Sequence, residues 1–156
     1  HTRFLPEEET ALVTQKQLES RIAAALGGRV AEEVVFYEIT TGAGNDLEQA
    51  TNIARAMITR LGMSKKLGPR TFGKREELVF LGKEISEQRD YSDQIAEEID
   101  DEVHGLLQEA YNTAKKLISG NRGKLSALAK YLIEHETIEG DELKNLLDKA
   151  PISLVA

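Results

Sequence analysis

Hydrophobic and polar positions follow a helical period over most of this 156-residue chain. After Thr14, apolar side chains recur every four residues, at Leu18, Ile22, Leu26, Val30 and Val34, as on one face of an α-helix. Thr14 and Gln17 have the spacing of a capping box, in which each side chain satisfies a free backbone N–H. The sequence therefore predicts a first helix from this point.

A glycine pair, Gly27-Gly28, lies inside this predicted helix. Each glycine costs about 1 kcal/mol relative to alanine in a helix interior. Close approach of another backbone is the usual compensation, and a kink is the alternative.

Four further helices are expected. The stretch "TTGAGNDLEQAT" (40–51) leads into a second helix that ends at Gly62, with apolar positions at Leu47, Ala50, Ala54, Met57 and Leu61. Ser92 is the expected cap of the longest helix, with its stripe at Ile95, Ile99, Val103, Leu106, Ala110, Ala114 and Leu117. Two shorter helices follow at about 122–134, with Leu125, Leu128 and Leu132 inward, and about 140–148, with Leu143, Leu146 and Leu147 inward.

The segment between the second and third helices is irregular and punctuated by glycines. Within it, "LVFLG" (78–82) predicts a short strand and "KEISEQRD" (83–90) predicts an exposed, mobile loop. The predicted fold is thus mainly α: a single helical domain over residues 1–156 with one or two short strands.

Charge and composition exclude several classes of function. The net charge is −7 without a basic stripe, so nucleic acid is not an expected partner. There is no cysteine, which excludes disulfides and thiolate chemistry. No apolar run approaches the roughly 20 residues that span a bilayer. The chain does not begin with Met, and we interpret it as part of a longer protein.

The three histidines do not predict a metal site. No two have the i, i+4 spacing of H-E-x-x-H. His1 is terminal, His104 is best interpreted as a surface partner of Asp100, and His135 suits the negative end of a helix dipole. A Ser/His/Asp triad stays open, although no serine lies in a G-x-S-x-G elbow. A phosphate loop of the form G-x-x-x-x-G-K-[ST] is absent.

Carboxylates are the remaining candidates. Asp46 begins the second helix, where local physics favours a helix-capping role. The same position suits a metal ligand, because the positive helix end favours the ionised carboxylate. Glu32 and Glu33, near the end of the first helix, are rival ligands, and a salt-bridged helix face is the simpler interpretation for them.

Several motifs occur in one order along residues 2–148: "FLPEEE", "ALGGRVAEEVVF", "TTGAGNDLEQAT", "IARAMITRLGMSKKLGP", "VFLG", "RDYSD" and "ID-EV…EAY". Together they resemble the C-terminal peptidase part of FtsH-type proteases, which are membrane-anchored, ATP-dependent zinc metalloproteases. The resemblance implies a homo-hexamer that degrades unfolded and membrane proteins, with ATP and Mg in a separate AAA+ module. It also implies that this part of the protein lies on the cytoplasmic, stromal or matrix side of the membrane.

The resemblance also implies a role for Asp46. The aspartate of the family motif TG-x-x-ND-L is the third zinc ligand, and Asp46 occupies that position. Glu32 and Glu33 would then be structural.

The family's H-E-x-x-H helix lies upstream of "FLPEEE", before this chain begins. We therefore expect no catalytic residue here, and neither tight zinc binding nor peptide hydrolysis by this chain alone, because a catalytic zinc needs three protein ligands. The segment "TRFLPEEE" (2–9) could be an edge strand that flanks the substrate cleft and binds extended peptides. Alternatively, it could be an edge strand with a structural role only.

Two alternatives belong to other classes. One is a non-catalytic homologue with a degenerate upstream motif, which serves assembly or chaperone-like holding. Retention of Asp46 favours the active form, because a dead site does not need that ligand. The other is an independent helical interaction module unconnected with proteolysis.

Overall fold

The computed structural model describes residues 12–75 and 87–152. These residues form five α-helices: α1 (Gln15–Phe36), α2 (Gly44–Thr59), α3 (Asp93–Gly120), α4 (Arg122–His135) and α5 (Gly140–Lys149). A short 3-10 turn, η1 (Thr41–Ala43), precedes α2. The prediction of a mainly α fold is confirmed.

Two short strands, β1 (Lys74–Arg75) and β2 (Glu87–Gln88), pair antiparallel, with Lys74 opposite Gln88. The strand predicted at 78–82 lies outside the described residues. The loop predicted at 83–90 falls partly outside them, and its described end is anchored: Asp90 Oδ1 accepts the Gly73 N–H at 2.7 Å. Residues 87–88 are thus paired with β1 where an exposed, mobile loop was predicted, while Arg89 and Asp90 are exposed as predicted.

Helix α1 begins as its sequence predicts. The Gln17 N–H donates to Thr14 Oγ1 at 3.3 Å and the Thr14 N–H donates to Gln17 Oε1 at 2.8 Å, which completes the capping box. The helix continues through Gly27 and Gly28 as one element to Phe36. Tyr37 ends it in the left-handed conformation, with φ 57°.

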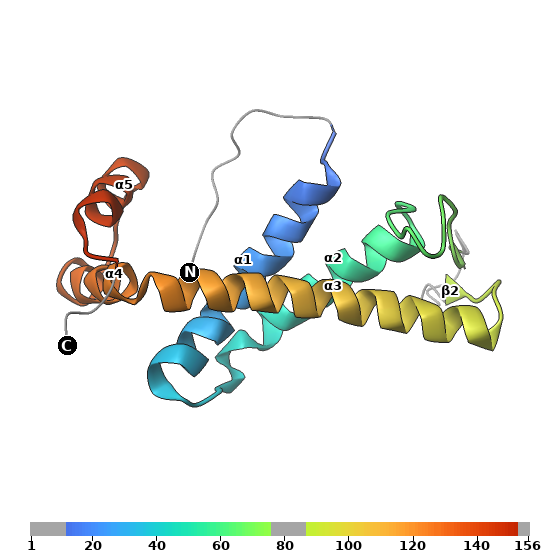
Figure 1. Cartoon of the computed structure of the whole chain (residues 1–156), viewed down its shortest axis with the longest axis horizontal. Coiled ribbons are helices and arrows are strands. Elements are labelled where there is room, and N and C mark those ends of the chain that lie inside the picture. The colour runs from blue at the N-terminus through green and yellow to red at the C-terminus, as the bar shows by residue number, and fades with distance from the viewer. Residues whose placement is uncertain (1–11, 76–86, 153–156) are drawn as a thin grey trace, which may run out of the picture.

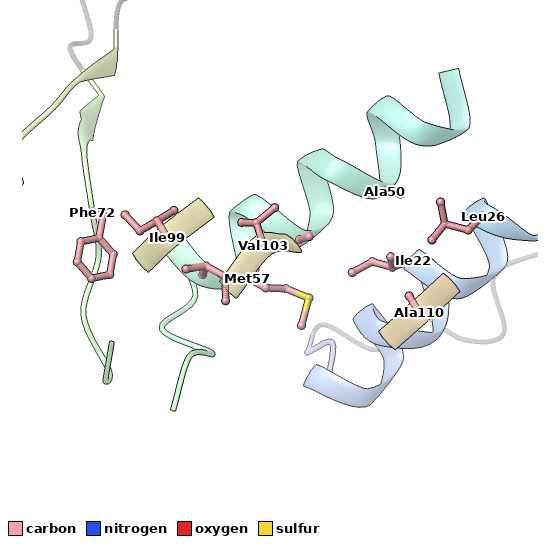
Figure 2. Packing of buried hydrophobic residues seen from close by; sticks show 10 residues of the cluster. Ile22, Leu26, Ala50, Met57, Phe72, Ile99, Val103 and Ala110 are labelled. Carbon is pink, nitrogen blue, oxygen red and sulfur yellow. The ribbon is translucent and has the colours of Figure 1, made fainter. Parts of the chain in front are cut away.

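The core lies where α3 crosses the hairpin of α1 and α2 (Figure 1). Its buried side chains come from these three helices and from the segment after α2: Ile22, Leu26, Ala50, Ala54, Met57, Ile58, Phe72, Ile99, Val103 and Ala110. Figure 2 shows Met57 beside Val103 in the middle of this row, with Ile22, Leu26 and Ala110 beyond it. Alanines on α2 and α3 let the helices approach closely, and the larger side chains fill the space between them.

Three positions predicted as apolar-face positions are exposed. Leu61 is 53% exposed, because α2 ends at Thr59 and the chain turns away. Phe72, only 2% exposed, packs into the core instead, and its N–H donates to the Thr59 carbonyl at 2.8 Å. Leu117 and Leu132 are also exposed, at 58% and 36%, since the end of α3 and the α4–α5 pair extend past the core (Figure 1).

Helices α4 and α5 match their predicted ranges closely and pack on each other at the end of α3 (Figure 1). The Tyr131 hydroxyl of α4 donates to Glu142 of α5. No helix within the described ranges is both long enough and apolar enough to cross a membrane.

Candidate metal centre

Asp46 lies in the first turn of α2 and is half-buried. The helix has Ala43 at its N-cap and no side-chain capping hydrogen bond. Within residues 12–75 and 87–152, the Asp46 carboxylate has no hydrogen bond or ion pair. The capping role that local physics favours is therefore not the one this side chain has.

The Asp46 carboxylate instead faces a glycine of α1. A Cβ atom built at Gly28 would lie 4.0 Å from Asp46 Oδ2, while one built at Gly27 would meet nothing within 4 Å. Among the described residues no other backbone lies close to either glycine, so the close backbone approach expected at the glycine pair is not found; the neighbour of Gly28 is the Asp46 carboxylate, at an ordinary contact distance. Because residue 28 is a glycine, no side chain from this position lies against that oxygen.

Glu32 has a different environment, at the loop between α1 and α2. Its Oε2 accepts the Thr40 N–H at 3.2 Å, and the Thr40 hydroxyl lies 3.1 Å from both carboxylate oxygens. The same hydroxyl oxygen accepts the Gly42 N–H at 3.2 Å. Glu32 therefore holds the loop that leads to Asp46.

Glu33 points to α3. It accepts hydrogen bonds from the Tyr111 hydroxyl at 2.6 Å and from Lys115 Nζ at 2.9 Å. The bond from Lys115, with that from Tyr111, lowers the pKa of Glu33 below its ordinary value of 4.5, and the same contacts raise the pKa of Lys115. Both rivals of Asp46 thus have protein partners, whereas Asp46 has none in the described part of the chain.

Two of the three histidines, His104 and His135, lie in the described residues. His135 stacks on Tyr131 with ring centroids 4.2 Å apart, and its Nδ1 lies 3.1 Å from the Tyr131 carbonyl. His104 is exposed beside an open groove between α1, α2 and α3, and no ion pair joins it to Asp100 among the residues described. His1 and the segment "TRFLPEEE" lie outside the described residues.

Asp46 fits one position in a zinc coordination sphere. Its oxygens have no hydrogen bond or ion pair within the described residues, and a carboxylate oxygen is one of the ligands that zinc takes in proteins. Over residues 12–75 and 87–152, no three His, Asp or Glu side chains gather as a metal site.

The family motif predicts Asp46 as a zinc ligand, and this role stays a prediction; the hydrogen bonds around it were not predicted. Nothing in the spacing connects Thr40 with Glu32 or Tyr111 with Glu33. The glycine pair inside α1 suggested a neighbouring backbone, whereas the neighbour of Gly28 is the Asp46 side chain.

The described residues form a mainly α domain with one carboxylate at a helix start that could take part in binding a metal. Residues 1–146 match Peptidase family M41, and the chain belongs to that family. It is 52% identical, over 99% of its length, to the ATP-dependent zinc metalloprotease FtsH of Chloroflexus aggregans. It is 54% and 49% identical, over 96% of its length, to FtsH 1 of Sphaerobacter thermophilus and to FtsH of Thermotoga maritima.

The chain spans about a quarter of the length of these curated relatives, namely 24%, 23% and 24%.

Proposed function

We propose that this chain is the C-terminal peptidase part of an ATP-dependent zinc metalloendopeptidase, and that Asp46 is the third protein ligand of its zinc. The observation that carries the proposal is the uncommitted Asp46 carboxylate beside Gly28, at the position that matches the family motif. The two imidazole ligands and the general-base glutamate would come from an H-E-x-x-H helix elsewhere in the whole protein. ATP and Mg would bind its ATPase module.

Within this arrangement each residue has a physical task. Asp46 supplies a carboxylate oxygen from the first turn of α2, and Gly28, which has no side chain, leaves room beside it for a bound cation. When bound, zinc supplies an activated water and polarises the peptide carbonyl. Helices α1, α2 and α3 hold the ligand on a rigid core.

The whole protein, by this proposal, is a membrane-anchored homo-hexamer that cleaves unfolded and membrane proteins. This chain would lie on the cytoplasmic, stromal or matrix side. Its family membership and its similarity to proteins named ATP-dependent zinc metalloprotease support the proposal.

The test is the substitution Asp46→Asn in the full-length protein. We expect loss of bound zinc by metal analysis and a fall in casein cleavage of more than about 100-fold, beyond the loss seen when a supporting group of a ligand is removed. ATP hydrolysis should change little, because the ATPase module is separate.

Glu48→Gln is the matched control, since Glu48 is an exposed acid two residues further along α2. It should keep both zinc and cleavage. Undiminished zinc and cleavage in Asp46→Asn would return the ligand to Glu32 or Glu33. A wild-type protein that hydrolyses ATP but binds no zinc and cleaves no casein would instead support the non-catalytic homologue.

A further inference from the structure

The connection between α1 and α2 is closed by one carboxylate. Glu32 lies in the last part of α1, and it receives both the backbone N–H and the hydroxyl of Thr40. These bonds close an eight-residue span between the two partners. The N-terminal boundary of η1 is therefore tied back to α1.

The Thr40 hydroxyl connects Glu32 to the backbone of Gly42. Its single proton is donated to Glu32, which turns the hydroxyl oxygen so that it accepts the Gly42 N–H at 3.2 Å. The packing here is close: a Cβ atom at Gly42 would lie 3.3 Å from Thr40 Oγ1 and 3.9 Å from Glu32 Oε1. Glu32, Thr40 and Gly42 form a hydrogen-bonded series, which we term the loop clamp.

The loop clamp lies directly before the candidate ligand. The turn η1 ends at Ala43, α2 begins at Gly44, and the Gly44 N–H donates to the Thr41 carbonyl. Ala43 is 5% exposed, so the junction is also fixed by packing. Because no linker separates the turn from the helix, an orientation set at Thr40 and Gly42 is transmitted to the first turn of α2, where Asp46 faces Gly28.

We propose that Glu32 is a positioning residue for the metal site: through Thr40 and Gly42 it orients the start of α2 and so holds the Asp46 carboxylate in place for zinc. The inference rests on the proposed function of Asp46 and adds to it. Glu32 itself does not touch the metal.

The test measures the zinc dissociation constant of the full-length enzyme by competition with a chromogenic chelator. Thr40→Val removes the hydroxyl at nearly constant shape, and Glu32→Gln places an amide N–H₂ where it competes with Gly42 for the hydroxyl oxygen. Both should weaken zinc binding about ten-fold, as loss of groups that orient a ligand does. Excess zinc should restore casein cleavage in both. Thr40→Ser keeps the hydroxyl and should bind zinc like the wild type.

Glu33→Gln is the matched control, since it changes the adjacent carboxylate, which contacts Tyr111 and Lys115 of α3 instead. It should lower the melting temperature of the metal-free protein and leave zinc affinity unchanged. If Glu32→Gln and Thr40→Val behave in this way too, the loop clamp serves stability alone and the inference is wrong.

Other outcomes separate this inference from the proposed function. If Asp46→Asn keeps its zinc, the proposed function fails. If Asp46→Asn loses zinc while Glu32→Gln and Thr40→Val bind it like the wild type, only the positioning role fails. Zinc loss in Glu32→Gln with normal binding in Thr40→Val would make Glu32 a ligand and overturn the positioning role.

Discussion

Adjacent glutamates near the end of α1 have unrelated roles because neighbours on a helix point about 100° apart. Glu32 turns to the loop before α2, and Glu33 turns to α3. The sequence shows two acids at this place and predicts a charged helix face. It does not identify Tyr111 and Lys115 as partners of Glu33, since they lie 78 and 82 residues away.

The Glu33–Lys115 pair predicts a definite dependence of stability on pH. The pKa of Glu33 is lowered from 4.5 in the folded chain, so its stabilisation is present above pH 4.5 and is lost as the pH falls through the folded value. The pKa of Lys115 is raised from 10.5, so its stabilisation is present below pH 10.5 and is lost as the pH rises through the folded value. Between these limits the contribution should be constant.

Glu33→Gln should therefore reduce the free energy of unfolding at neutral pH, and the difference from the wild type should shrink as the pH falls below 4.5. Urea unfolding over a series of pH values measures this. Glu48→Gln, at an exposed acid without a hydrogen bond in the described residues, should show no such trend. A difference for Glu33→Gln that is the same at every pH would contradict the assignment.

At the scale of elements, helical period and capping residues predict most of the fold. The caps at Thr14 and Ser92 begin α1 and α3 as expected, because their side chains bond to N–H groups within the first turn. The end of α2 was predicted less well. Leu61 continues the apolar spacing, but α2 has already ended at Thr59, and the left-handed conformation of Gly62, with φ 61°, then redirects the chain. Phe72 fills that end of the core, because the segment after α2 folds back onto it. The helical period of α2 cannot predict this contact.

Alanine substitutions on α2 test this reassignment of its apolar face. Met57→Ala should reduce the free energy of unfolding by about 2–5 kcal/mol, because a fully buried side chain leaves a cavity between three helices. Leu61→Ala should change it by less than about 0.5 kcal/mol, as at other surface positions; the side chain is 53% exposed. Chemical denaturation of both variants measures the difference, and comparable losses would restore Leu61 to the core.

At the scale of the whole molecule, the buried side chains of the described residues are distributed unevenly among the helices. The buried side chains of the core cluster come from α1, α2, α3 and the Phe72 segment, whereas α4 has only Gly123 buried and α5 has no buried residue. Sequence pattern predicted all five helices, whereas the ligand role that the family motif implies for Asp46 stays a prediction. The pattern could not place the helices relative to one another, because each amphipathic face is compatible with many partners. The single domain expected over residues 1–156 thus stays a prediction.

Hydrogen exchange can decide whether the chain opens as one unit. Since α4 and α5 bury little apolar surface and are joined to the rest at the end of α3 (Figure 1), they should open without the core and exchange their amide hydrogens much faster than α1 and the core part of α3. Leu128→Ala, in α4, should speed exchange in α4 and α5 and leave α1–α3 unchanged, while Ile99→Ala, at a 2% exposed core position, should speed exchange throughout α1–α3. Faster exchange in all five helices after Leu128→Ala would mean that the chain opens as a single cooperative unit, and the α4–α5 pair would then contribute to the rigidity of the core that holds Asp46.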